Sequence, residues 1–170
     1  MMAFAAWLHA TSFSQMIQSV RWIIPLLQSI HIVMIGIVFV SSVVIALHVL
    51  GRVRADDSFQ AVWGRFAPWS RTALVVMLVT GLLLVVGEPE REFSALSFWI
   101  KMGLVAIGVT GTAAFGRRYG ATPADSAHPY PAPARLAAVA LIVLWVAVVL
   151  LGRAIAYDVE MWGAGVLPWN

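Results

Sequence analysis

The chain has no cysteine, few charged residues, and no histidine in three of its four long apolar runs. Without a thiol it can form neither disulfides nor iron–sulfur clusters, thiolate metal sites or covalently attached c-type haem. Charged residues make up 11% of its 170 residues, whereas a soluble domain carries about a quarter. Together with a hydrophobic content of 61%, this scarcity of charge excludes an ordinary soluble fold and places the chain among membrane proteins.

The chain contains four long apolar runs. A helix that crosses a bilayer needs about 20 mostly apolar residues, and the runs reach that length at about 22–50, 68–87, 96–116 and 135–157. Ahead of them, residues 3–20 alternate aromatic and aliphatic side chains with Ser, Thr and Gln at the spacing of a helix in the membrane interface. The sequence therefore predicts an all-α integral membrane protein, a four-helix bundle in a single domain, 1–170, with an N-terminal interfacial helix.

Positive charge is unevenly distributed among the segments that join these spans. Arg52, Arg54 and Arg65 follow the first span, and Arg117 and Arg118 follow the third, whereas GEPEREFSA between the second and third has one arginine among three glutamates. Since basic loops stay in the cytoplasm, we expect a multi-pass protein of the bacterial inner (cytoplasmic) membrane with both termini in the periplasm.

The first residues lack a basic n-region, so no cleaved signal peptide is expected. The arginines orient the chain and do not indicate a nucleic-acid partner.

Three ionisable side chains interrupt the apolar runs: His31, Lys101 and Arg153. A charge at the centre of a membrane helix costs roughly 2.5–3.5 kcal/mol, so such residues by default mark a functional site. Counted along the helices from the expected outer surface, they lie about 9, 8 and 6 Å deep, which allows one pocket that opens to the periplasm. Alternatively, Lys101 and Arg153 extend to the headgroups, and His31 makes a hydrogen bond between helices.

A cofactor at this depth would have few protein ligands. A b-type haem commonly takes two axial ligands from different helices, and the absence of histidine from spans two to four excludes two haems in one chain. One haem b can be held by His31 with Met102 or Met34, or by His31 of two protomers, with Lys101 or Arg153 pairing with the propionates. Copper or another metal is the alternative, with His31 and Met34 as ligands. In the remaining interpretation, the methionines are packing material.

A second histidine, His48, lies at the other end of the first span. It is about 25 Å from His31 along the helix axis, so the two cannot share a ligand. We interpret His48 as structural.

Several stretches together resemble an uncharacterised bacterial family of small four-helix inner-membrane proteins, a domain of unknown function. They are WIIPLLQSIHIVMIGIVFV, FAPWSRTALVVMLVTGLLL, EPEREFSALSFWIKMGLV and RLAAVALIVLWVAVVLLGRAIAY, and they cover most of residues 21–157. In that family the first span typically carries a histidine like His31, the third a Lys-Met pair like Lys101-Met102, and the last a Gly-Arg pair like Gly152-Arg153. A histidine early in a small bundle is also similar to copper-resistance D-type and b-type cytochrome membrane proteins. The resemblance implies the fold and the residue set, and no activity.

These observations lead to hypotheses of different classes. The first is a redox-related membrane protein that holds a haem b or a metal in a periplasm-facing pocket and passes electrons to or from a quinone or a partner protein. The alternative is a non-catalytic accessory subunit without a cofactor, which stabilises a larger membrane complex or a homo-oligomer. A third is a carrier of a small anion that uses Lys101 and Arg153. The sequence shows no nucleophile–base–acid set and no phosphate loop, so whether the protein is an enzyme is left open.

Overall fold

The computed structural model describes residues 1–119, 130–163 and 167, and in these residues it contains helices and no strand. The helices, in chain order, are α1 (Met2–His9), α2 (Ser12–Ser19), α3 (Ile23–Val49), α4 (Phe59–Gly87), α5 (Pro89–Ser94), α6 (Leu96–Tyr119), α7 (Ala132–Ala154), the 3-10 turn η1 (Ile155–Tyr157) and α8 (Asp158–Trp162). Four of them, α3, α4, α6 and the continuous α7–η1–α8 segment, are long and apolar enough to cross a membrane. The expected all-α membrane bundle is confirmed.

The helix boundaries follow from capping residues. Helix α4 begins at Phe59, well before the expected start near 68, because Ser58 accepts a hydrogen bond from the Ala61 N–H and caps the helix. Pro68 lies inside α4 and does not end it. The expected interfacial helix over 3–20 is divided into α1 and α2 because Thr11 caps α2 by accepting from the Ser14 N–H.

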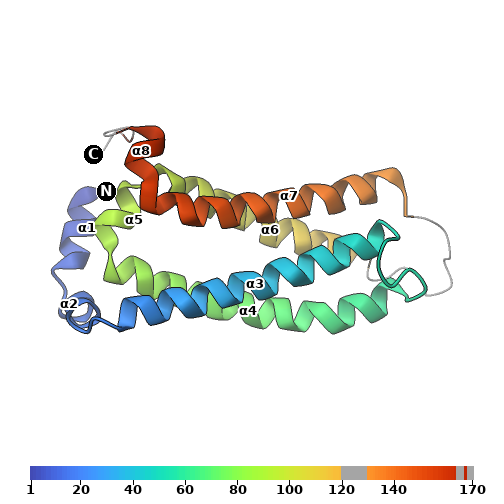
Figure 1. Cartoon of the computed structure of the whole chain (residues 1–170), viewed down its shortest axis with the longest axis horizontal. Helices are drawn as coiled ribbons and strands as arrows, with labels where there is room; N and C mark the ends of the chain where they lie inside the picture. Colours follow the sequence, from blue (N-terminus) through green and yellow to red (C-terminus); the bar gives the residue numbers. More distant parts are fainter. Residues whose placement is uncertain (120–129, 164–166, 168–170) are drawn as a thin grey trace.

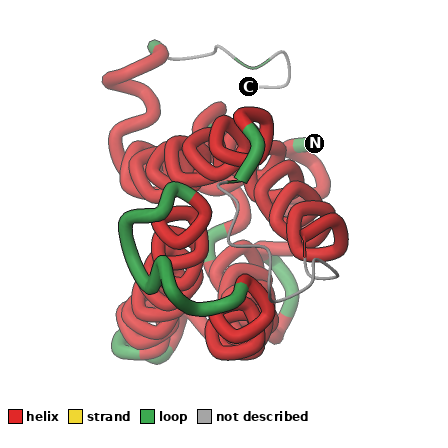
Figure 2. The backbone as a smooth tube through the Cα atoms, turned by 90° about the vertical axis from the view of Figure 1, so that its right-hand side faces the viewer, coloured by secondary structure: helices red, strands yellow, loops and turns green. Residues whose placement is uncertain are grey.

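The long helices form two antiparallel pairs. Helix α3 packs along α4, α6 packs along α7, and α3 also packs along α7 and so joins the pairs (Figure 1). Figure 2 views the bundle nearly along the long helices. The short helices α1, α2, α5 and α8 gather at one end of the bundle, here called the terminal end (Figure 1). At the opposite end, here called the loop end, residues 50–58 join α3 to α4.

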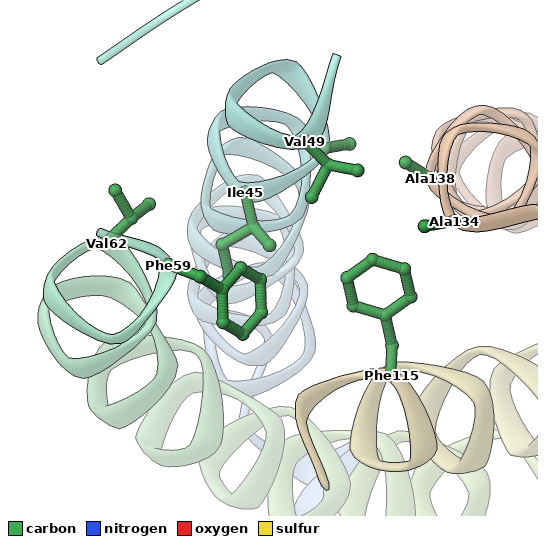
Figure 3. Close-up of a cluster of buried hydrophobic side chains, with 8 residues drawn as sticks. Ile45, Val49, Phe59, Val62, Phe115, Ala134 and Ala138 are labelled. Atoms are coloured by element: carbon green, nitrogen blue, oxygen red, sulfur yellow. The ribbon is translucent and has the colours of Figure 1, made fainter. Parts of the chain in front are cut away.

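Buried apolar side chains are concentrated toward the loop end. One cluster contains Ile45, Ala46, Val49, Phe59, Val62, Phe115, Ala134 and Ala138, contributed by all four long helices (Figure 3). A second cluster, Val38, Ala73, Trp145 and Val148, lies nearer the middle, and a third, Ala95, Phe98 and Ile155, lies at the terminal end. The tightest shared packing is therefore at the loop end.

Close approach of α6 to its neighbours depends on glycine. A Cβ added at Gly108 would lie 2.7 Å from Leu144 Cδ2 on α7, and one added at Gly116 would overlap the Trp63 indole of α4. Small residues at helix interfaces of membrane proteins allow the backbones to pack closely. Both glycines therefore hold α6 against the rest of the bundle.

Candidate functional site around His31

The His31 side chain reaches from α3 to α4. Its Nδ1 lies 2.9 Å from Thr80 Oγ1, and the Thr80 hydroxyl donates to the carbonyls of Val76 (2.8 Å) and Met77 (3.2 Å) in its own helix. Because the single Thr80 hydrogen is used in this way, its oxygen accepts from His31 Nδ1–H. This assignment leaves Nε2 with a free lone pair when the imidazole is neutral.

The residue after Thr80 provides the space for this ring. A Cβ added at Gly81 would lie 3.2 Å from His31 Cε1, closer than ordinary van der Waals contact. The Thr-Gly pair in α4 thus supplies both the hydrogen-bond acceptor for the imidazole and the room that the imidazole occupies.

The second histidine of α3 has a different environment. His48 is 3% exposed, its Nδ1 lies 3.0 Å from the Arg54 carbonyl, and its Nε2 lies 3.3 Å from the Tyr130 hydroxyl. Both of its ring nitrogens are engaged, and together they tie the segment after α3 to the start of α7, which is a structural role. His31 Nε2, by contrast, has no hydrogen-bond partner in the described part of the chain.

Lys101 extends from α6 toward α7. A Cβ added at Gly152 would lie 3.7 Å from its Nζ, an ordinary van der Waals distance, so the ammonium group lies beside Gly152. The charge of Lys101 is close enough to interact with both His31 and Glu92. Lys101 therefore interacts electrostatically with a histidine of the bundle interior and with a carboxyl group of α5 at the terminal end.

Glu92 was not singled out by the sequence, where it is one of three glutamates in an acidic segment. Its burial raises its pKa, an effect that the positive charges of Lys101 and Arg91 partly oppose and that Glu88 reinforces. The only sequence signal for its role is a carboxylate shortly before an intramembrane lysine. Glu92 is thus a half-buried carboxyl group within electrostatic range of Lys101.

Two of the predicted site residues face away from this group. Arg153 is exposed and places its guanidinium carbon 5.6 Å from the centre of the Tyr157 ring, a cation–π contact. Met102 is 38% exposed. Of the five predicted residues, His31, Met34 and Lys101 point into the bundle, and Arg153 and Met102 do not.

A methionine that the sequence did not single out lies beside His31. Met77 is 8% exposed and is one turn from Thr80 on α4, and its backbone carbonyl approaches the His31 ring. A buried methionine in an apolar span has no distinguishing pattern, so only the packing of α3 on α4 identifies it.

The terminal end has a separate polar arrangement. The Asp158 carboxylate accepts from the backbone N–H groups of Leu96 (2.9 Å) and Ser97 (2.8 Å) and so caps the start of α6. A cavity of about 250 Å³ beside it is lined in part by Arg91, Tyr157 and Glu160, and His31 does not line it. Among the described residues, no three His, Cys, Asp or Glu side chains gather to hold a metal ion.

The comparisons with known proteins identify a family for this chain and assign no activity to it. No curated protein and no solved structure matches the chain, so the resemblance to cytochrome-type membrane proteins is not shown. A sequence model of a family of unknown function matches residues 5–158, a range that includes His31, Lys101, Glu92 and Arg153. The chain therefore belongs to this family of unknown function, DUF6644.

Proposed function

We propose that this protein is a redox-related protein of the bacterial inner membrane that holds a metal ion, or a haem b, at His31. One observation carries the proposal: Thr80 fixes Nδ1 of His31, while Nε2 has no hydrogen-bond partner among the residues that the structure describes. Metal-ligating histidines almost always donate their second ring N–H to an oxygen, which sets the tautomer and orients the ring. His48, with both nitrogens engaged, lacks this arrangement.

The packing favours a metal ion over a haem with two ligands from this chain. A haem b commonly takes its protein ligands from different helices, whereas Met34 lies one turn from His31 on the same helix. Met102 points outward. Of this chain's predicted ligands only His31 would therefore hold a haem, with any second ligand coming from another molecule, whereas a small ion needs less space.

A metal ion or haem held by His31 would supply one-electron chemistry. Because a quinol gives up two electrons and two protons on becoming a quinone, its oxidation would need two such centres, or one centre from which a protein partner takes each electron in turn. The opposite direction reduces a quinone with the same balance. With the basic loops in the cytoplasm, the terminal end of the bundle, where Glu92 and Lys101 lie near His31, faces the periplasm.

The test is the cofactor content of the purified, full-length protein. We expect about one metal ion or haem per chain by elemental analysis and visible spectroscopy, with loss of the cofactor in His31→Ala. His9→Ala changes an exposed histidine of α1 and serves as the matched control. A colourless, metal-free protein, or a content unaffected by His31→Ala, contradicts the proposal.

A non-catalytic accessory subunit is the second candidate, and one observation favours it. Gly103 on α6 is exposed, and a Cβ added there would meet nothing within 4 Å, so this part of α6 presents a surface that another helix can approach closely. Co-purification of a cofactor-free chain with other membrane subunits after mild solubilisation would support this role. A cofactor-free chain that purifies alone contradicts it.

A further inference from the structure

The register of α3 on α4 can be read from two contacts. His31 lies opposite Thr80, to which it is hydrogen-bonded, and Val38 lies in the same buried cluster as Ala73. Val38 is seven residues after His31, and Ala73 is seven residues before Thr80. The two antiparallel helices therefore keep the same register from one contact to the other. Met34 and Met77 fall between them, each three residues, about 4.5 Å along the axis, from the level of the His31–Thr80 hydrogen bond.

Both methionines face the protein interior. Met77 is 8% exposed, and Met34 is partly buried against the cluster that contains Val38 and Ala73. Residues three apart on a helix share one face, so Met34 follows His31 on the same side of α3. Met102, the remaining methionine of the long apolar helices outside α8, is 38% exposed.

The chemistry of these three side chains selects a particular class of ion. Two thioether sulfurs are soft donors and an imidazole nitrogen also suits copper, so the set favours Cu(I) over the hard cations that need carboxylates. All three donors are neutral, so a monovalent ion brings one uncompensated charge into the bundle and a divalent ion brings two. The nearby charge of Lys101 increases the electrostatic penalty for the divalent ion.

We propose that His31 Nε2 and the thioether sulfurs of Met34 and Met77 form a binding site for Cu(I) between α3 and α4. This site deepens the proposed function and rests on it, since it assigns the centre held by His31 to a soft monovalent metal. Met77 is the new ligand, and Thr80 is a positioning residue that holds the imidazole with Nε2 available.

The first experiment is a Cu(I) titration of the purified, full-length protein in detergent under reducing conditions, in competition with bicinchoninate. We expect one Cu(I) per chain, with affinity reduced at least about tenfold in Met77→Leu and in Met34→Leu, the lower bound of what loss of even an outer-shell partner costs. Leucine conserves volume. Met102→Leu is the matched control and should bind Cu(I) as the wild type does.

The second experiment needs no variant. X-ray absorption at the copper edge of the wild-type protein should show nitrogen and sulfur neighbours, and a shell of nitrogen and oxygen alone overturns the site. Unchanged Cu(I) affinity in Met77→Leu, or an equal loss in Met102→Leu, also overturns it.

The outcomes separate this site from the broader proposal. If the protein purifies with a haem that His31→Ala removes, and binds no Cu(I), the copper site fails and the redox function stands. If His31→Ala abolishes Cu(I) binding but Met77→Leu does not, the assignment of Met77 fails alone. A protein that carries no haem or metal and binds no Cu(I) refutes both.

Discussion

At the scale of single residues, the two histidines of α3 have different roles. His48 has a partner on each ring nitrogen and joins two segments of the loop end. Within the described residues, His31 has a hydrogen-bond partner on one ring nitrogen only, and this difference, not burial or depth, distinguishes a candidate ligand from a structural histidine.

The role of Thr80 can be tested by removing its hydroxyl. Thr80→Val leaves His31 Nδ1–H without its acceptor, and loss of such an outer-shell partner typically costs about 10- to 100-fold in metal affinity. We expect a loss of this size in the metal content or affinity of the purified protein, and recovery in Thr80→Ser. Thr110→Val is the control, because the hydrogen bonds of the Thr110 hydroxyl in the described part of the chain go to carbonyls of its own helix. Wild-type affinity in Thr80→Val would show that His31 is oriented by something else.

The raised pKa of Glu92 predicts how the stability of the folded protein depends on pH. Burial raises its pKa, so the folded protein holds this proton more tightly than the unfolded chain. The stability that the protonated group contributes is complete below the unfolded pKa and is lost as pH rises through the higher folded pKa. The wild-type melting temperature should therefore fall across this window, and Glu92→Gln should reduce the slope.

The measurement is thermal unfolding in detergent from about pH 4 to about pH 8, a range that includes the titration of carboxyl groups in proteins. Glu90→Gln, which changes the exposed glutamate of the same short helix, is the control and should keep the wild-type slope. Equal slopes in the wild type and Glu92→Gln would contradict the assigned environment of Glu92.

The sequence identified His31 and Lys101 because ionisable groups stand out in apolar runs. It could not separate them from Arg153, since depth along a helix says nothing about rotation around its axis, and Arg153 turns outward to Tyr157. Met77 and Glu92 were not identified from the sequence, because a methionine among aliphatic residues and a glutamate in an acidic segment have no local signal. Their roles depend on partners in other helices.

At the scale of secondary-structure elements, the apolar runs predicted the four long helices, and local polar contacts set several of their ends. Helix α4 begins at Phe59, directly after its Ser58 cap and nine residues before the expected start near 68, which adds about 14 Å of helix. The start of α6 is capped by Asp158, which lies more than 60 positions later in the chain. A cap from so distant a residue cannot be read from the local sequence.

The packing of α6 on α4 gives the clearest prediction at this scale. In Gly116→Ala the new methyl group would overlap the Trp63 ring, and overpacking of this kind typically costs about 1–3 kcal/mol. We expect a lower free energy of unfolding by titration with a denaturant in detergent.

The matched substitution is Gly103→Ala, in the same helix but with open space around the added carbon. Alanine favours a helix over glycine by up to about 1 kcal/mol, so this variant should equal or exceed the wild type. A similar loss in both variants would mean that helix α6 itself, and not its contact with Trp63, responds to the substitution.

At the scale of the whole molecule, the two ends of the bundle differ in charge. Exposed arginines cluster at or near the loop end: Arg52, Arg54, Arg65, Arg71, Arg117, Arg118 and Arg135. The short helices of the terminal end carry most of the acidic residues, including Glu88, Glu90, Glu92, Asp158 and Glu160. This asymmetry supports the proposed orientation, with the loop end in the cytoplasm.

Because the chain has no cysteine, single cysteines report this orientation without background. We expect a membrane-impermeant maleimide to label Glu160→Cys in intact cells whose outer membrane has been made permeable. Asp56→Cys, in the segment between α3 and α4, should react only after the inner membrane is opened. The reverse labelling pattern would place the His31 site on the cytoplasmic side.

The position of α3 between α4 and α7 has a consequence for biogenesis. During synthesis the first hairpin, α3 and α4, leaves the ribosome before α6 and α7 exist, and domains generally fold in this order. His31, Met34, Met77 and Thr80 all belong to that hairpin, so a nascent chain that has inserted only its first half already carries the complete donor set. The second hairpin then docks against α3 and brings Lys101 toward His31, so the proposed donor set would be assembled before this positive charge arrives.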